Sequence, residues 1–393
     1  MQHIVKKFWK TYQNNLKSVK IFGTTAEEIA KDLNFGNKVC LITGASSGIG
    51  LEITRCLTSI DCNVLMACRN PYIARNTAKN VCKNFDRLAF YELNLASLSS
   101  VQKCIKSLLQ SQKSIDIVIL NAATFGLPWT LTENGLETTF QVNFLSQYYL
   151  LLSIEKILSP NARVVFTSSE SHRNVELSEG ARVFPSLDHF SLSAERYTSI
   201  RSYNLSKVCG VLAARYLHQR WLHAGPAVFC AHPGSFVKTG LCRNWWVYEA
   251  LYTTMLPFSK SIGQAASTIA YCATSPELAG QSGFYFKGCR RCEPSELAGS
   301  TYLAYSFCTS AGAGAAFAAF AVGAAAEREP LFMRCGAICA GAGCPLFTWM
   351  CARLLPSLSA VIQCLGTIYI KHKLCNLYEQ ITSLTRRQCG EKM

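Results

Sequence analysis

Short apolar runs alternate with stretches of helical periodicity from Lys38 to His232. The apolar runs have the length of strands, and turn residues bound them. They predict strands over Lys38–Ile42, Asn63–Cys68, Leu88–Leu95, Ile115–Leu120, Arg163–Ser168 and Ala227–His232. Apolar residues at helical spacing predict helices over Leu51–Thr58, Pro71–Asn84, Ser97–Gln110, Leu136–Leu158 and Ser199–His223.

This alternation is typical of βαβ units, in which helices cover both faces of a parallel sheet. We therefore predict an α/β fold with a doubly wound parallel sheet of the Rossmann type. Ligands of such folds bind beyond the carboxyl ends of the strands. The residues that follow predicted strands include Arg69, Asn121, Ser169 and Pro233-Gly234. We expect these candidates to lie along one edge of the sheet.

A glycine-rich stretch, Thr43-Gly-Ala-Ser-Ser-Gly-Ile-Gly50, links the first strand to the first helix. Glycines allow a sharp turn and a close approach of the backbone to a ligand. The N-terminus of the following helix presents free N–H groups and the positive end of its dipole. The stretch therefore predicts a phosphate-binding site, and a purely structural tight turn is the alternative.

The same stretch also contains the G-x-S-x-G spacing of a hydrolase nucleophile elbow, from Gly44 to Gly48. A hydrolase would need a later acid and a later histidine, for which Asp188 and His232 are available. This interpretation explains neither Gly50 nor the pair of residues described next. We therefore favour the phosphate site.

Tyr203 and Lys207 lie four residues apart in a predicted helix, so that both side chains project from one face. The pKa of a free phenol is about 10, and a positive charge nearby favours the phenolate. The pair is therefore a candidate general acid and base. The pattern is frequent by chance, and an isolated pair would most simply be two surface residues.

The pair is not isolated, because motifs in the same order along the chain resemble those of the short-chain dehydrogenase/reductase family. The resemblance runs from about Phe22 to about Ser300 and implies a single catalytic domain. One departure is an alanine in place of the glycine that ends the family's Asn-Ala-Gly signature. The matching residues are Thr43 through Gly50, Asn121-Ala122-Ala123, Asn143, Ser169, Tyr203, Lys207 and Pro233-Gly234.

The resemblance implies roles for these residues. Tyr203 would exchange the proton with the substrate oxygen, while Lys207 would lower the pKa of Tyr203 and bind the nicotinamide ribose. Ser169 would hold the substrate oxygen, and Asn143 would hold a water that relays the proton. The dinucleotide supplies the hydride, and the protein supplies binding and orientation. The implied cofactor contacts are Thr43, Gly44, Ser46, Ser47, Gly48, Ile49, Gly50, Arg69, Asn94, Leu95, Asn121, Ala122, Ala123, Tyr203, Lys207, Pro233 and Gly234.

Arg69 bears on the choice between the two nicotinamide dinucleotides. NAD enzymes of this architecture place an acidic residue about twenty positions beyond the glycines, on the ribose hydroxyls. Here that place holds Cys68-Arg69, and an arginine can pair with the 2′-phosphate of NADP(H). We therefore expect NADP(H) to be favoured over NAD(H). Asn94 stands where the family often has an aspartate near the adenine, which predicts weaker binding there but not its loss.

Charge and cysteine content argue against other classes of function. The 393 residues carry a formal net charge of +15, but the charge is spread out, so that we expect no nucleic-acid partner. The 20 cysteines form no regular framework, which favours reduced thiols and a cytoplasmic protein. Cys289-Arg-Arg-Cys292 lacks a second pair at zinc spacing, so that we expect no metal site.

The composition changes towards both ends of the chain. It predicts a basic N-terminal arm over residues 1–21, the catalytic domain over 22–305, and an apolar tail rich in Ala, Gly and Cys over 306–393. The uncharged stretches Phe307–Ala326, Cys335–Ala352 and Leu354–Ile370 approach the length of a membrane span. The tail is therefore either a membrane hairpin, which would associate the enzyme with a membrane, or a disordered low-complexity segment.

The resemblance also bears on substrate and partners. It implies a small apolar carbonyl or alcohol substrate, such as a steroid or retinoid, under a cover formed by Trp245, Trp246, Tyr248 and Phe258. Packing of that region in the core, or between the subunits of a homo-oligomer, is the alternative. Some members of the family carry WW modules before the domain, but only Trp9 precedes residue 100, so that partners bound through such a module are not expected. A second class of function stays open, an interaction protein in signalling or apoptosis that retains the dinucleotide fold while turnover is secondary.

Overall fold

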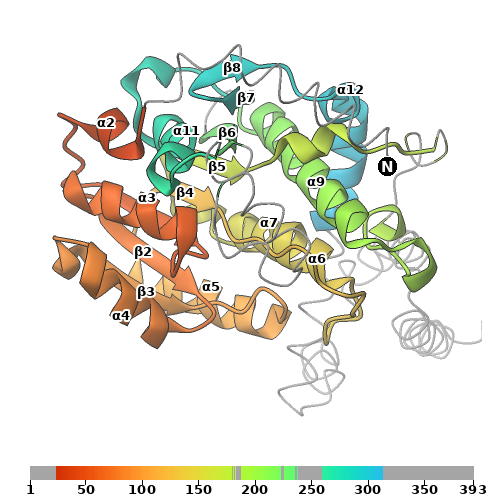
Figure 1. Cartoon of the computed structure of the whole chain (residues 1–393), viewed down its shortest axis with the longest axis horizontal. Helices are drawn as coiled ribbons and strands as arrows, with labels where there is room; N and C mark the ends of the chain where they lie inside the picture. The colour runs from red at the N-terminus through yellow and green to blue at the C-terminus, as the bar shows by residue number, and fades with distance from the viewer. Residues whose placement is uncertain are drawn as a thin grey trace, which may run out of the picture.

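A computed structural model of the chain describes residues 24–178, 180, 182, 187–222, 225–234, 237 and 259–312. The strands of this part of the chain are β1 Val39–Thr43, β2 Asn63–Cys68, β3 Leu88–Glu92, β4 Ile115–Leu120, β5 Leu158–Thr167, β6 Ala227–His232, β7 Phe284–Lys287 and β8 Arg290–Cys292. They form one eight-stranded sheet in the order β3-β2-β1-β4-β5-β6-β7-β8 (Figure 1). All neighbours are parallel except β7 and β8, which pair antiparallel.

Helices connect the strands and cover both faces of the sheet. Their bounds are α2 Ala26–Ala30, α3 Gly48–Ser59, α4 Pro71–Val81, α5 Leu98–Ser111, α6 Thr138–Phe140, α7 Ser146–Ser153, α9 Ser199–Arg220, α11 Ile262–Thr274 and α12 Glu296–Gly299. Residues 301–312 are also helical. The predicted doubly wound parallel sheet is therefore confirmed.

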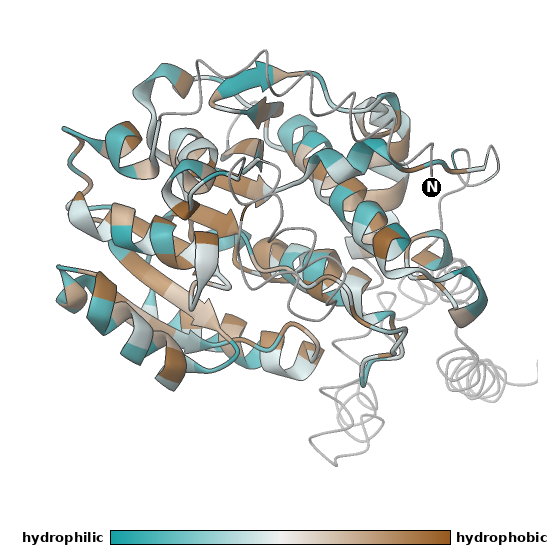
Figure 2. Cartoon of the chain, in the orientation of Figure 1, coloured by the Kyte–Doolittle hydropathy of each residue, from teal (hydrophilic) through white to brown (hydrophobic). Residues whose placement is uncertain are grey.

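Each face of the sheet has its own apolar core. Residues of α5, α7, α9 and the helical segment 301–312 pack on one face. Residues of α2, α3, α4 and α11 pack on the other face. Strand β1 divides between them, because Leu41 belongs to the first core whereas Cys40 and Ile42 belong to the second. Figure 2 shows hydrophilic residues on the outward faces of the surrounding helices, as expected when only one face of a helix is buried.

The helix predicted over Leu136–Leu158 is shorter and irregular. Helix α6 is followed by a π-helical turn, Gln141–Leu145, and α7 ends at Ser153. Strand β5 begins at Leu158, five residues before the predicted start at Arg163. Leu158 pairs with Ile115 of β4. Pro160 disfavours helical backbone in Ser159 and cannot donate a helical hydrogen bond, which fits the extended backbone of β5 at this point.

The strand order reverses at β1, which lies between β2 and β4. In a doubly wound sheet such a reversal leaves a crevice at the carboxyl ends of the strands, and ligands bind there. Within residues 24–312, gaps excluded, no helix is long and apolar enough to cross a membrane. The predicted N-terminal arm, the tail beyond residue 312 and the predicted cover of Trp245, Trp246, Tyr248 and Phe258 lie outside the described residues.

Candidate active site

The glycine-rich turn between β1 and α3 leaves the start of α3 open. Gly44 and Gly48 have φ angles of +67° and +56°, in the left-handed region that glycine adopts without strain. Ser47, the N-cap of α3, makes no side-chain hydrogen bond to the helix. By contrast, α2, α4, α5, α9 and α11 are capped by the side chains of Thr25, Asn70, Ser97, Thr198 and Ser261. The first N–H groups of α3 are therefore available to an anion.

Gly50 allows the glycine-rich turn to meet the end of β4. A Cβ atom at this position would lie 2.5 Å from the carbonyl oxygen of Gly44 and 2.6 Å from Nδ2 of Asn121. Asn121 Nδ2 donates to the carbonyl oxygen of Thr43 at 3.1 Å. The Thr43 hydroxyl accepts from the backbone N–H groups of Asn121 and Ala122 at 2.9 and 3.1 Å. These bonds hold the two motifs together beside the crevice.

Arg69, Asn94 and Leu95 follow the neighbouring strands β2 and β3. The side chain of Arg69 is exposed at the end of β2. The side-chain oxygen of Asn94 accepts from the backbone N–H of Ala96 at 3.2 Å, so that one of its lone pairs is already in use. Leu95 is buried, and its carbonyl oxygen accepts from the side chains of Gln141 and Ser146.

Asn143 lies in the π-helical turn between α6 and α7. Its side chain bonds both backbone groups of Thr124: Nδ2 donates to the carbonyl oxygen at 3.0 Å and Oδ1 accepts from the N–H at 2.7 Å. Nδ2 also donates to Oγ of Ser206 at 3.1 Å, and Ser206 donates to the carbonyl oxygen of Tyr203 at 2.7 Å. Asn143 is thereby connected to the helix that carries Tyr203. π-helical turns of this kind are frequent at functional sites.

Gln147 is a buried residue of this site that the sequence analysis missed. Its Oε1 accepts from the Thr43 hydroxyl at 2.6 Å, and its Nε2 donates to the carbonyl oxygens of Ala122 and Asn143, each at 2.9 Å. One side chain therefore bonds three of the predicted motifs. The signal that could have found it is its spacing, because Gln147 follows Asn143 by four residues on one helix face.

Tyr203 and Lys207 are adjacent on α9, as the spacing predicted. The Nζ atom of Lys207 lies 5.4 Å from the centre of the Tyr203 ring and donates to the carbonyl oxygen of Thr167 at 2.9 Å. Burial lowers the pKa of Lys207 from 10.5 to about 8. Phe125 contacts the Tyr203 ring edge-on, with ring centroids 5.0 Å apart. The phenol and the ammonium are thus held at the end of β5.

Ser169 follows β5 and begins a short 3-10 helical turn, Glu170–Arg173. Helix α9 packs against this turn. Its hydroxyl oxygen accepts from the backbone N–H of Ser171 at 3.2 Å, and its hydroxyl hydrogen is donated to Oγ of Ser171 at 3.0 Å. The Ser171 N–H uses only a lone pair of the Ser169 oxygen and does not involve the hydroxyl hydrogen. The Ser169 hydroxyl hydrogen can therefore rotate from Ser171 to another acceptor.

Pro233 and Gly234 follow β6 at the same edge of the sheet. Gly234 has a φ angle of +115°, and a Cβ atom there would lie 2.6 Å from Cδ of Lys260. His232 precedes them and is buried, and within the described part of the chain neither of its ring nitrogens has a hydrogen-bond partner. Burial lowers the pKa of His232 to about 3. A relay from Asp188 through His232 to Ser46, as a hydrolase would need, therefore finds no support.

Cys289 lies in the two-residue turn between β7 and β8, and Cys292 is the last residue of β8. The cysteines of the described residues are free thiols. Over those same residues, no group of His, Cys, Asp and Glu side chains is arranged to hold a metal ion. The Cys-Arg-Arg-Cys pattern thus belongs to the β7–β8 hairpin.

Comparison with known proteins gives consistent matches. The sequence pattern of the short chain dehydrogenase family matches residues 38–178. The WW domain-containing oxidoreductase of Drosophila melanogaster is 42% identical over 285 residues, which are 71% of this chain and 69% of the relative. Retinol dehydrogenase 12 of Mus musculus is 33% identical over 260 residues, 65% of this chain and 78% of the relative. A crystal structure of a short chain dehydrogenase from Shigella flexneri in complex with NADP has a TM-score of 0.51 at 19% identity, over 66% of this chain and 98% of that one, and is similar in fold.

Proposed function

Because this chain belongs to the short-chain dehydrogenase/reductase family, and is thus an oxidoreductase, we propose that it interconverts an apolar carbonyl compound and its alcohol with NADP(H). The observation that carries the proposal is the pair on α9. A buried lysine ammonium lies 5.4 Å from the ring centre of a half-buried tyrosine, beside the turn that begins at Ser169.

The chemistry follows from the charge and hydrogen-bonding capacity of these groups. In the direction of reduction, Tyr203 donates its phenolic proton to the substrate oxygen, and the Lys207 ammonium stabilises the phenolate that remains. Ser169 donates its hydroxyl hydrogen to the same substrate oxygen. Asn143, whose side chain bonds Thr124 and Ser206, would hold a water that relays a proton from solvent back to Tyr203. The nicotinamide, when bound, supplies the hydride.

The residues of the turn after β1 fit a dinucleotide. The uncapped start of α3 offers N–H groups to the pyrophosphate. Gly50, where a Cβ atom would meet the Gly44 carbonyl oxygen and Asn121 Nδ2, lets this turn pack closely against the end of β4. Asn121, Ala122 and Ala123 follow at the end of β4. Arg69, exposed at the end of β2, pairs with the 2′-phosphate of NADP(H). This contact is the basis for preferring NADP(H) to NAD(H).

The substrate proposal draws on the relatives. Retinol dehydrogenase 12 acts, by its name, on an apolar alcohol, and we extend that class of substrate to this chain. Retinaldehyde and steroid ketones are therefore the first compounds to test. The free thiols of the described residues suit a reducing compartment, and we place the enzyme in the cytoplasm.

The test is the dependence of turnover on one hydroxyl. Tyr203→Phe removes the phenol oxygen and keeps the ring that contacts Phe125. We expect kcat for NADPH oxidation with retinaldehyde or a steroid ketone to fall by about 10²- to 10⁴-fold, the usual contribution of a general acid. Affinity for NADPH should change little.

A matched control is Tyr216→Phe, which removes a phenol oxygen from the same helix outside the proposed site. It should leave kcat unchanged. If no carbonyl in the panel gives turnover that depends on Tyr203, the proposed reaction is wrong.

A further inference from the structure

The residues after Ser169 fold into a short 3-10 helical turn, Glu170–Arg173, which is tied to the edge of the sheet. The Glu170 carboxylate accepts hydrogen bonds from the Tyr285 hydroxyl at 2.9 Å and from the Lys287 ammonium at 3.1 Å. Arg173 donates to the same carboxylate at 3.3 Å. Tyr285 and Lys287 belong to β7, so that Glu170 links the turn after β5 to a strand two places away in the sheet.

The Glu170 carboxylate is ionised at neutral pH. Burial alone would raise its pKa, but His232, Lys287 and Arg173 face it and, together with the hydrogen bond from Lys287, hold the pKa below its usual value. All three hydrogen bonds are therefore made to a charged acceptor, and those from Lys287 and Arg173 also have a charged donor. Such bonds are stronger than hydrogen bonds between neutral groups. The link between the turn and β7 is accordingly a firm one.

His172 makes a second link, and its side chain is fully buried. Its Nδ1 atom lies 2.7 Å from the carbonyl oxygen of Ser169, and its Nε2 atom accepts from the backbone N–H of Ser295 at 3.0 Å. The imidazole also packs against the Tyr285 ring, with centroids 4.9 Å apart. Ser295 caps α12, so that one side chain joins Ser169 to the segment that follows β8.

Both bonds of His172 require one protonation state. A carbonyl oxygen can only accept, so Nδ1 must carry a hydrogen, whereas the N–H of Ser295 can only donate, so Nε2 must not. Burial lowers the pKa of His172, which favours the neutral ring that this arrangement needs. No other side chain has two nitrogens of opposite character at this separation, so that histidine is specifically suited to the position.

We infer that Glu170 and His172 are positioning residues, which clamp the turn on both sides and thereby fix the Ser169 hydroxyl. The inference rests on the function proposed above, in which that hydroxyl holds the substrate oxygen. Ser171, which accepts from and donates to Ser169, belongs to the clamped turn. The rate of an enzymatic step falls by about a hundredfold when a reacting group is displaced by about 1 Å. Loss of the clamp should therefore lower kcat without removing any group that touches substrate.

The test is a double-mutant cycle between His172 and Ser169. His172→Phe keeps a ring against Tyr285 and removes both hydrogen bonds, and it should lower kcat by about 10- to 100-fold. NADPH affinity, which does not involve this turn, should stay within about twofold of the wild-type value. In a Ser169→Ala background the same change should have little further effect on kcat, because residues that act through one group are not additive.

Two further variants separate positioning from general stability. His172→Asn restores an N–H donor near the Nδ1 position and should recover part of the lost kcat. His218 is a partly buried histidine of α9 that the proposal does not use. Its substitution, His218→Phe, should leave kcat unchanged. If His172→Phe lowers kcat equally in the presence and absence of the Ser169 hydroxyl, the inference is wrong. If Ser169→Ala has no effect on kcat, the proposed function fails instead.

Hydrogen exchange tests the clamp without any need for turnover. In His172→Phe and in Glu170→Gln, the backbone amides of residues 169–174 should exchange faster than in the wild type, while those of α3 should not change. Unchanged exchange across the turn in both variants would remove the clamp itself.

Discussion

Arg69 is the residue on which the choice of dinucleotide depends in our proposal. Its guanidinium is exposed at the end of β2, next to the strand that leads into the glycine-rich turn. Arg69→Asp replaces a group that attracts the 2′-phosphate by one that repels it and that suits ribose hydroxyls. We expect the Kd for NADPH to rise by about tenfold or more, equivalent to at least about 1.4 kcal/mol, and the Kd for NADH to rise less or to fall. Fluorescence titration of both dinucleotides measures this ratio.

The control for Arg69→Asp must change net charge equally at a distance from the strand ends. Lys103→Asp, at an exposed position of α5, does so. It should leave the ratio of the two affinities close to the wild-type value, because the charges of exposed groups far from the ligand are largely screened. A preference that is unchanged in Arg69→Asp would contradict the cofactor proposal.

Lys207 makes the stability of the protein depend on pH. Burial lowers its pKa from 10.5 to about 8, so that the buried ammonium destabilises the folded state below pH 8. This cost fades as pH rises from about 8 towards 10.5, because there the unfolded chain binds the proton more strongly than the folded chain. Lys207→Met removes the charge. The difference in unfolding free energy between variant and wild type should therefore shift by up to about 3 kcal/mol over that pH interval, in favour of the wild type at high pH.

Denaturant unfolding at several pH values between 7 and 10.5 checks this shift. The lost hydrogen bond to Thr167 gives the variant a constant penalty, which does not affect the slope. A difference between the two proteins that stays constant with pH would show that Lys207 is not buried as an ammonium.

The site residues differ in how far the sequence could identify them. Tyr203 and Lys207 could be paired because four-residue spacing places two side chains on one helix face, which is a local property. Gln147 has the same relation to Asn143, but its bonds to Thr43 and Ala122 join segments that only the order of the strands brings together. His172 is similar, because its partner Ser295 lies 123 residues further along the chain. Long-range contacts of this kind leave no periodic signal in a single sequence.

At the level of elements, the strand–turn–helix unit of β1 and α3 depends on Gly50. An added methyl group would meet the Gly44 carbonyl oxygen at 2.5 Å and Asn121 Nδ2 at 2.6 Å. The first atom is backbone, and the second is held by hydrogen bonds to the carbonyl oxygens of Thr43 and Gly44. We expect Gly50→Ala to lower the free energy of unfolding by about 1–3 kcal/mol, as overpacking does, and to weaken NADPH binding by separating the turn from β4. Urea unfolding and dinucleotide titration measure the two effects.

Gly299→Ala is the matched control, because nothing lies within 4 Å of a Cβ atom at that position in α12. It should be neutral or stabilising by up to about 1 kcal/mol, since alanine is the better helix former. Equal effects of the two substitutions would contradict the close approach at Gly50.

The elements themselves were predictable to different degrees. Strands β1, β2, β4 and β6 could be predicted because parallel strands buried on both faces read as continuous apolar runs. The same holds for the second half of β5, whereas β3 is an edge strand without a fully buried side chain. Strands β7 and β8 were missed, because each is short and β8 carries Arg290 and Arg291 at the edge of the sheet. The π-helical turn at Asn143 could not be predicted either, because it continues the helical pattern of its neighbours. The order of the strands depends on packing between distant segments, which a single sequence does not reveal.

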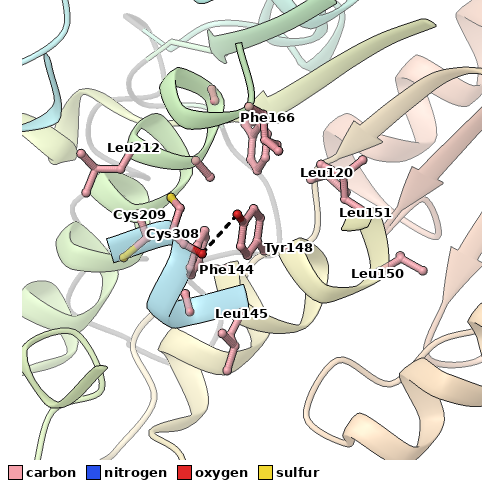
Figure 3. Packing of buried hydrophobic residues seen from close by; sticks show 14 of the residues in the cluster. Leu120, Phe144, Leu145, Tyr148, Leu150, Leu151, Phe166, Cys209, Leu212 and Cys308 are labelled. Carbon is pink, nitrogen blue, oxygen red and sulfur yellow. Dashed lines mark hydrogen bonds between the residues drawn. The ribbon is translucent and has the colours of Figure 1, made fainter. Parts of the chain in front are cut away.

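At the scale of the whole molecule, the helical segment 301–312 joins the core on the face that carries α7 and α9. Figure 3 shows Tyr148 of α7 pointing towards Cys308, and its hydroxyl donates to the Cys308 carbonyl oxygen at 3.4 Å. Burial raises the pKa of the Tyr148 phenol far above its usual range, so that the group stays a neutral donor. The segment therefore stabilises the helix that follows Asn143, which connects the end of the described chain to the candidate site.

Phe307 is the side chain through which this connection can be tested. It is fully buried, and its ring centroid lies 5.4 Å from that of Phe144 and 4.2 Å from that of Phe190. Phe307→Ala should lower the free energy of unfolding by about 3–5 kcal/mol, the cost of removing a buried phenyl ring, with a single cooperative transition in urea. Tyr305→Ala, on the exposed face of the same segment, should cost less than about 1 kcal/mol. If the two substitutions cost the same, the segment does not belong to the core; if Phe307→Ala instead gives two separate transitions, the segment unfolds independently of the sheet.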